Sequence, residues 1–170
     1  MTSTPKTGLS PEPGPQGKKE AFRTALEKAR RLCASREYCI SDMRTRIEGW
    51  GISSTTETDE IIASLISDRF IDEQRYASAF ARDKLRYNKW GRIKIAYHLK
   101  MKGIPVSLVS EVIQGLDDDE YRETASKIIA MLKRQKKGGG VHQEKARIVK
   151  SMQSRGFEIG LSLELLNEAD

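Results

Sequence analysis

A stretch without acidic residues, from Lys84 to Ser110, carries side chains suited to binding a polyanion. The aromatic residues Tyr87, Trp90 and Tyr97 are interleaved there with a set of cations: Lys84, Arg86, Lys89, Arg92, Lys94, Lys100 and Lys102. Lysine and arginine neutralise phosphates, and flat aromatic rings stack on bases. The stretch therefore predicts contact with nucleic acid or with a protein assembly that carries it. The alternative is a solvated helix face, which is the usual role of a charge run.

A second basic stretch runs from Lys133 to Arg155, and Glu144 is the only acidic residue in it. The cations expected to extend the contact are Lys133, Arg134, Lys145, Arg147 and Lys150. Because the charge imbalance is local and recurs, we favour an anionic or nucleoprotein partner over a merely solvated face for both stretches.

One expected helix in the first basic stretch is apolar on two sides. Ile95 and Leu99 form the stripe expected of a core-facing helix. Ile93, Tyr97 and Met101 form another stripe at positions i, i+4 and i+8 on the opposite side. This second stripe either packs against a neighbouring repeat or forms an exposed partner-binding strip flanked by two lysines. The sequence leaves both alternatives open.

Catalytic and metal-binding motifs are absent from the sequence. There is no GxxxxGK[ST] phosphate loop, no HExxH and no GxSxG. The acidic pair that starts at Asp72 fits helix capping better than acid–base chemistry. Cys33 and Cys39 lack the spacing of a metal knuckle, and His98 and His142 are distant in sequence. We therefore predict a protein that is not an enzyme and that needs no cofactor and no metal.

Composition points to a basic, helical protein. The 170 residues carry a formal net charge of +6, with 38% hydrophobic and 6% aromatic residues, which suits thin helical layers better than one thick core. No apolar run is long enough to span a membrane, and no secretory segment is visible, so we expect a cytoplasmic protein with reduced thiols. Residues 1–18 are rich in proline and glycine and predict a disordered arm.

Local chemistry marks several helix boundaries beyond this arm. Asp72 is placed to cap a helix, which we expect to run to Trp90 and to end at Gly91. Pro105 predicts the start of another helix, where its missing N–H costs nothing. The acidic run 117–120 begins a helix whose far end is basic, as the helix dipole favours. We find no alternating strand pattern.

The sequence contains an internal repeat centred on Gly51, Gly103 and Gly156, which lie 52 and 53 residues apart. Apolar residues stand eight and four positions before each glycine and one position after it: Met43, Ile47 and Ile52; Ile95, Leu99 and Ile104; Ile148, Met152 and Phe157. Each segment therefore predicts an amphipathic helix that ends at a glycine, a place where positive φ is often needed.

This repeat predicts an all-α fold, an elongated array of three tandem three-helix repeats. We place the repeats at residues 20–71, 72–117 and 118–170. Such an array makes contacts mainly between neighbours and can be stable as a monomer. An elongated basic molecule is suited to following a groove.

One segment of the second repeat resembles a known family. The run FIDEQRYASAF, residues 70–80, is similar to the motif of the RecX family, in which an apolar-Ile-Asp-acidic segment leads into Arg-Tyr-Ala and an aromatic residue. Trp90-Gly91-Arg92 and Lys102-Gly103-Ile104 also resemble that family. The first and third repeats match it only by pattern.

The resemblance implies a regulator of RecA in homologous recombination and DNA repair. Such a protein lies in the helical groove of the filament of RecA on single-stranded DNA and inhibits its ATP hydrolysis and strand exchange. Modest contacts at several protomers would reinforce one another. The main alternative is a direct duplex-DNA-binding protein with helix-turn-helix-like units. A third possibility is a scaffold whose basic faces are only solvated.

Overall fold

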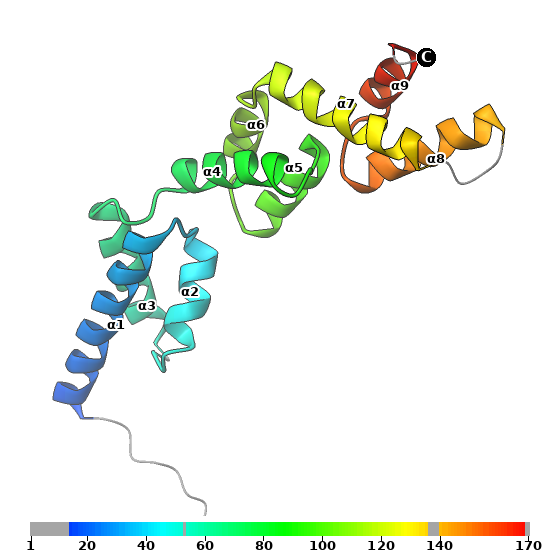
Figure 1. Ribbon diagram of the computed structural model, residues 1–170. Coiled ribbons are helices and arrows are strands. Elements are labelled where there is room, and N and C mark those ends of the chain that lie inside the picture. The colour runs from blue at the N-terminus through cyan, green and yellow to red at the C-terminus, as the bar shows by residue number, and fades with distance from the viewer. Residues whose placement is uncertain (1–13, 53, 136–139, 169–170) are drawn as a thin grey trace, which may run out of the picture. The chain divides into compact units, whose positions relative to one another are not determined.

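The computed structural model describes residues 14–52, 54–135 and 140–168, and all regular structure in these ranges is helical. The helices follow in three successive sets of three (Figure 1): α1 (Pro15–Ser35), α2 (Ile40–Glu48), α3 (Thr55–Ser67), α4 (Glu73–Arg86), α5 (Arg92–Met101), α6 (Val106–Gln114), α7 (Asp118–Arg134), α8 (Val141–Ser154) and α9 (Ile159–Glu168). The predicted all-α class is confirmed. Of the expected N-terminal arm, residues 1–13 lie outside the described residues.

Helix α1 begins earlier than the sequence pattern indicates. Pro15 stands in its first turn and Gly14 is its N-cap, so the helix starts inside the segment expected to be an irregular arm. Proline favours the first turn of a helix because the N–H that it lacks would have no intrahelical acceptor there.

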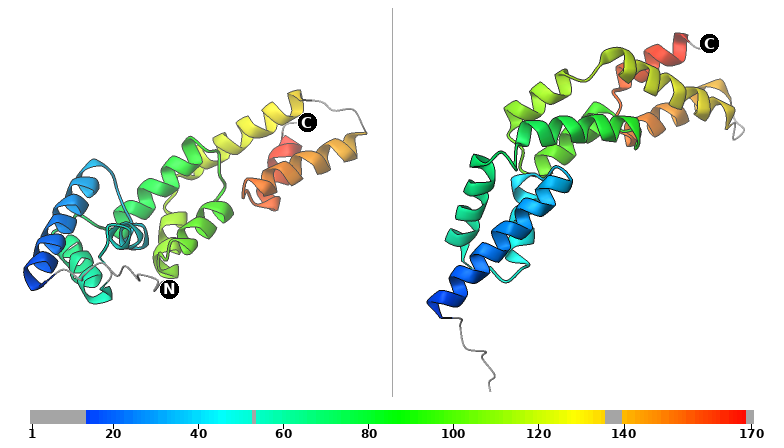
Figure 2. Two further views of the ribbon diagram at one scale, coloured as in Figure 1. Left: turned by 90° about the horizontal axis from the view of Figure 1, so that it is seen from below. Right: turned by 60° about the vertical axis from the view of Figure 1, so that its left-hand side comes forward.

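The chain divides into two compact units. The first unit holds residues 43–70 and those before residue 37, and in it α1 packs beside α3 (Figure 2). Ala29, Ile47 and Leu65 are fully buried in this unit. Arg30 binds Asp68 across α1 and α3 at 2.6 Å.

The second compact unit holds residues 37–42 and 71–170, so it includes both the second and the third set of helices. Helix α7 packs against α8 and α9 and also contacts α4 (Figure 1). Buried side chains of α4 to α6, such as Leu85 and Leu99, belong to one core with Tyr121, Ile129 and Met152 of α7 and α8. The binding residues expected on both basic stretches therefore stand on one body.

The three repeat glycines take the predicted conformation. Gly51, Gly103 and Gly156 all have positive φ, at 88°, 78° and 87°. After the second and third glycines the next residue donates its N–H to the carbonyl five residues back, as Phe157 does to Met152 at 3.1 Å. This pattern closes a helix C-terminus, and the apolar residue after each glycine is buried.

Gly91 serves a different purpose from the one that the sequence suggests. Helix α4 ends at Arg86 rather than at Trp90, and Gly91 is the N-cap of α5 with φ −82°. A Cβ at Gly91 would lie 2.2 Å from the Gly156 carbonyl oxygen. The backbones meet there because the Gly91 N–H donates to Arg155 at 2.8 Å and the Ile93 N–H donates to Gly156 at 3.0 Å.

A buried tyrosine reinforces this backbone joint. The Tyr121 hydroxyl accepts the Arg92 N–H at 3.0 Å and donates to Glu158 at 2.6 Å. Burial raises the pKa of Tyr121 above its ordinary value, and the hydrogen bond to Glu158 raises it further. The phenol therefore stays protonated and keeps donating. The joint fixes the first turn of α5 against the turn that follows α8.

The N-terminus of α4 is capped as predicted. Asp72 accepts the Arg75 N–H at 2.9 Å, while Ile71 and Tyr76 on either side are buried. Asp72→Ala is expected to lower the free energy of unfolding by about 1 kcal/mol, because one first-turn N–H loses its acceptor. Urea denaturation measures this loss. Asp72→Ser keeps an acceptor and should recover most of it, and equal stability of the two variants would contradict the capping role.

Candidate binding surface

The second apolar stripe of α5 is on the surface. Ile93, Tyr97 and Met101 are 59%, 59% and 69% exposed, whereas Ile95 and Leu99 on the same helix are completely buried. Val106, at the start of α6, is 66% exposed. The stripe is therefore not part of the core of the compact unit that holds α5. We call Ile93, Tyr97 and Met101 the α5 strip. Contiguous exposed apolar side chains of this kind are typical of partner-binding sites.

Two lysines of α5 differ in their exposure and in their contacts within the fold. Lys100 is exposed and makes no ion pair within the part of the chain that the structure describes. Lys94 is half-buried; its ammonium lies 4.8 Å from the centre of the Trp90 ring and donates to the Ser154 carbonyl at 3.5 Å. Both keep a positive charge on the helix that carries the strip.

Three cations of the first basic stretch are held by carboxylates. Arg86 binds Glu120 through two hydrogen bonds of 2.6 and 2.9 Å. Arg92 binds Asp118, and Lys102 binds both oxygens of Asp42 at 2.8 Å. The hydrogen bond to Glu120 raises the pKa of Arg86, and the same bond lowers the pKa of Glu120. These three side chains form ion pairs between different segments of the fold, and their carboxylate partners partly neutralise their charge.

The aromatic residues of the stretch also divide into two kinds. Trp90 is half-buried, stacks on His98 at 4.5 Å and has the Lys84 ammonium 5.0 Å from its ring centre. The Trp90 ring is therefore already in contact with side chains of its own fold. Tyr87 is 80% exposed, and Tyr97 touches only the edge of His98 among the ring contacts of the described chain. Lys89, two positions after Tyr87, has φ 57° and donates to the Arg86 carbonyl at 2.6 Å.

The predicted cations of the third helix set are likewise of two kinds. Arg147 binds Glu144 and the Leu132 carbonyl, and the hydrogen bond to Glu144 raises its pKa. Lys145 donates to Asn167 at 3.5 Å, and Lys133 is half-buried. Arg134 and Lys150 are exposed and form no ion pair in the described ranges. Lys136 and Lys137 lie outside the described residues.

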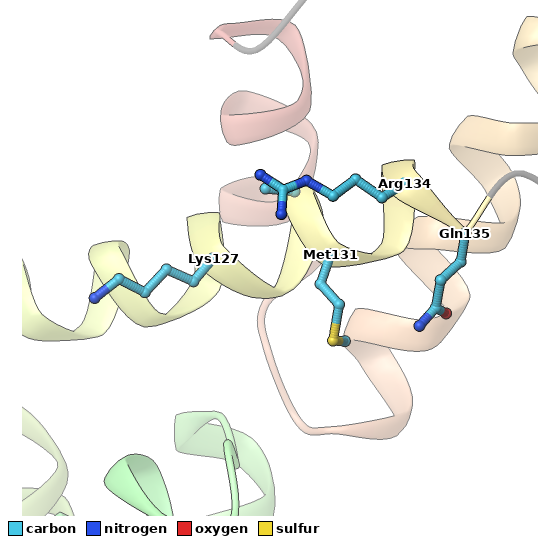
Figure 3. A pocket seen from close by; sticks show the side chains of 5 residues that line it. Lys127, Met131, Arg134 and Gln135 are labelled. Carbon is cyan, nitrogen blue, oxygen red and sulfur yellow. The ribbon is translucent and has the colours of Figure 1, made fainter.

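One of the hollows on the described surface is formed by a single helix. A hollow of about 370 Å³ lies along α7, where Met131, Lys127, Arg134 and Gln135 line it (Figure 3). These side chains all come from one helix and its C-cap. It is therefore a surface depression and not a pocket enclosed by several elements.

The described ranges offer neither a metal site nor a membrane-spanning helix. No group of three or more metal-ligating side chains comes together there. None of the described helices is both long and apolar enough to cross a membrane.

Sequence reasoning missed two features of this surface. Val106 is a further exposed apolar side chain outside α5, and its position right after Pro105 could have indicated a first-turn residue with nothing to cover it. The Gly91–Gly156 contact joins residues 65 positions apart (156 − 91). Nothing in the local sequence distinguishes this glycine from a helix-ending one.

Comparisons with known proteins agree with the fold. Residues 72–113 match the family model described as RecX, second three-helix domain. The regulatory protein RecX of Lactobacillus johnsonii is 25% identical over 153 residues, which cover 90% of this chain and 56% of that relative. The regulatory protein RecX of Chlorobaculum tepidum is 26% identical over 84% of each chain. This chain thus spans little more than half the length of one relative and most of the other.

A solved structure supports the same architecture. The crystal structure of RecX from Lactobacillus salivarius superposes with a TM-score of 0.79, covering 88% of this chain and 97% of that chain at 17% sequence identity. At this level of identity the likeness shows the fold alone.

Proposed function

Since the chain belongs to the RecX family of regulatory proteins, we propose that it binds the filament that RecA forms on single-stranded DNA and lowers its ATPase and strand-exchange activity. In this proposal the protein is a cytoplasmic monomer that binds in the helical groove of the filament. It catalyses no reaction of its own. Its role is to limit homologous recombination and DNA repair by RecA.

The α5 strip is the observation that carries this proposal. Three large apolar side chains stand exposed on a helix whose opposite side is fully buried, inside the segment that matches the family model. Backbone hydrogen bonds at Gly91 and Ile93 hold the first turn of this helix in place, so a partner does not have to order the helix itself. Apolar and aromatic anchors of this kind supply most of the binding energy of protein interfaces.

The cations around the strip favour a nucleoprotein partner over an uncharged one. Lys94 and Lys100 share α5 with the strip, and Lys150 and Arg134 add exposed charge on the same compact unit. Positive charge raises the rate of encounter with a phosphate-rich filament. Lys84, Lys89 and Lys145 contribute to the same field, while Arg86, Arg92, Lys102 and Arg147 contribute less because carboxylates neutralise them.

The decisive experiment is RecA ATPase activity on single-stranded DNA with this protein titrated in at moderate salt. We expect a dose-dependent fall at well below one protein per RecA protomer. A binding control without RecA shows whether the protein removes the DNA by itself. Unchanged ATPase activity together with tight binding to bare duplex DNA would overturn the proposal and support a duplex-binding function for the helix–glycine–helix units.

Lys100→Glu is expected to weaken inhibition and to flatten its salt dependence, with the salt slope falling by about one. Lys100 is the suitable position because it is exposed and unpaired in the described chain, whereas reversing Arg92 would also place two carboxylates together at Asp118. Inhibition of the RecA ATPase at several salt concentrations measures the change. Lys19→Glu on α1 alters the net charge equally, and an identical effect of both variants would contradict a specific role.

A further inference from the structure

A short segment between α1 and α2 belongs to the second compact unit, although the chain before it and directly after it belongs to the first. We call this segment, residues 37–42, the latch. Its first three residues have no regular structure, and its last three form the first turn of α2. Tyr38 and Cys39 are buried, and Cys39 belongs to the core of the second unit. The other four residues are half-buried, so two neighbouring side chains account for most of the burial.

The end of the latch is attached to the C-cap of α5. The Ser41 hydroxyl donates to the Lys102 carbonyl at 2.7 Å, and the Lys102 ammonium donates to both oxygens of Asp42 at 2.8 Å. Carbonyls at the end of a helix lack an intrahelical donor, and Ser41 supplies one. Lys102 directly follows Met101 of the α5 strip. The latch therefore holds the end of the helix that carries the strip.

The beginning of the latch is attached to the first turn of α4. The Glu37 carboxylate accepts from Arg75 at 2.5 Å, and the Ile40 N–H donates to the Glu73 carboxylate. The side chains of the two ion pairs that hold the latch are between 32% and 46% exposed. Ion pairs that water reaches add little to stability. A segment with little burial and with exposed polar contacts can open while the rest of a protein stays folded.

We propose that the latch opens and closes on the folded second unit, and that the closed latch fixes the Met101 end of the α5 strip. Main-chain hydrogen bonds at Gly91 and Ile93 hold the other end of α5, so opening loosens the helix at one end. An open latch lowers the fraction of molecules that are ready to bind, and the apparent affinity falls with that fraction. This effect on binding rests on the proposed function, whereas the opening itself does not.

Cys39 reports on the latch, because a thiol reacts only where a reagent reaches it. The chain has two cysteines, so Cys33→Ser leaves Cys39 as the single thiol. The Cys39 thiolate attacks dithiobis(nitrobenzoate), forms a mixed disulfide with one half of the reagent and releases the other half as a coloured thiolate. We expect slow labelling at a rate that stays nearly constant in low concentrations of urea, since a short opening exposes little surface.

Ser41→Ala combined with Asp42→Ala should raise the labelling rate about tenfold in this background, because their hydrogen bonds exist only in the closed latch. The urea midpoint measured by circular dichroism should change little. The matched control is Asp59→Ala, which removes a 2.6 Å ion pair to Arg44 inside the first unit and should leave the rate unchanged. A wild-type-latch rate that rises steeply with urea, or an equal rate in the latch variant, would overturn the opening.

Alkylation of Cys39 by iodoacetamide, with loss of iodide, tests the coupling to α5. The added group does not fit the completely buried site of Cys39, so the labelled protein keeps the latch open. Amide hydrogen exchange should become faster at residues 99–104 and stay unchanged in α7. The labelled protein should need about fivefold more for half-maximal inhibition of the RecA ATPase. Cys33→Ser with Cys39→Ser, treated in the same way, controls for alkylation elsewhere.

The two proposals fail in different ways. Unchanged exchange at residues 99–104 after alkylation would overturn the coupling of the latch to α5. Labelling and exchange are both measured without RecA, so they decide the latch independently. Failure of the proposed function appears instead as RecA ATPase activity that the unlabelled protein does not change.

Discussion

Gly91→Ala is expected to lower the free energy of unfolding by about 3 kcal/mol or more, a large effect for one methyl group. The new Cβ would meet the Gly156 carbonyl oxygen at 2.2 Å and the Phe157 nitrogen at 2.4 Å. These are backbone atoms held by hydrogen bonds, so they cannot turn aside as a flexible side chain can. Since φ of Gly91 is −82°, alanine can adopt this backbone conformation without strain. The lower free energy of unfolding would therefore come only from the clash of the new Cβ with the backbone of residues 156 and 157.

Two other glycines provide controls for Gly91→Ala. Gly160 in α9 has open space around it, so Gly160→Ala should be neutral or stabilise by up to about 1 kcal/mol. Gly103 also has open space but φ 78°, so Gly103→Ala should cost only the left-handed conformation, about 1–2 kcal/mol. Urea denaturation of the three variants gives the ranking. A Gly91→Ala protein as stable as the wild type would contradict the backbone joint.

Tyr97→Ala is expected to leave the protein folded and to raise the concentration needed for half-maximal inhibition of the RecA ATPase about 30-fold. The side chain is 59% exposed, and its one ring contact in the described chain is the edge of His98 at 5.5 Å. Removal should therefore change the stability by no more than about 0.5 kcal/mol. An aromatic anchor at the centre of an interface typically contributes about 2 kcal/mol, which corresponds to this change in affinity.

The matched control for Tyr97→Ala is Val141→Ala. Val141 is 73% exposed on α8, so it removes exposed apolar surface outside the strip. Its inhibition should equal that of the wild type. A Tyr97→Ala protein that unfolds would indicate a structural role for Tyr97, and one that inhibits normally would remove the α5 strip from the proposed interface.

Features that depend on neighbouring residues were predictable from the sequence. The cap at Asp72 and the helix ends at Gly51, Gly103 and Gly156 each follow from a backbone requirement that one residue type meets. The all-helical class followed from the same periodic pattern. The end of α4 was wrong because Lys89, not a glycine, takes the left-handed conformation there.

Features that depend on distant residues were not predictable. Arg86, Arg92 and Lys102 look like Lys100 in the sequence, yet their carboxylate partners lie 26 to 60 positions away. Charge counting therefore overestimated how many cations are available to a partner. The α5 strip was recognisable as a second stripe, but only the packing of the other helices decides that it is exposed.

The joint at Gly91 and Gly156 also has a consequence for how this protein can change. It is made largely of main-chain atoms, which every residue carries, so it places few demands on the side chains around it. Substitutions along the outward side of α5 can alter which partner is recognised without disturbing how that helix is seated. A designer could accordingly randomise Ile93, Tyr97 and Met101 while keeping the two glycines and Tyr121, and select new specificities on an unchanged scaffold.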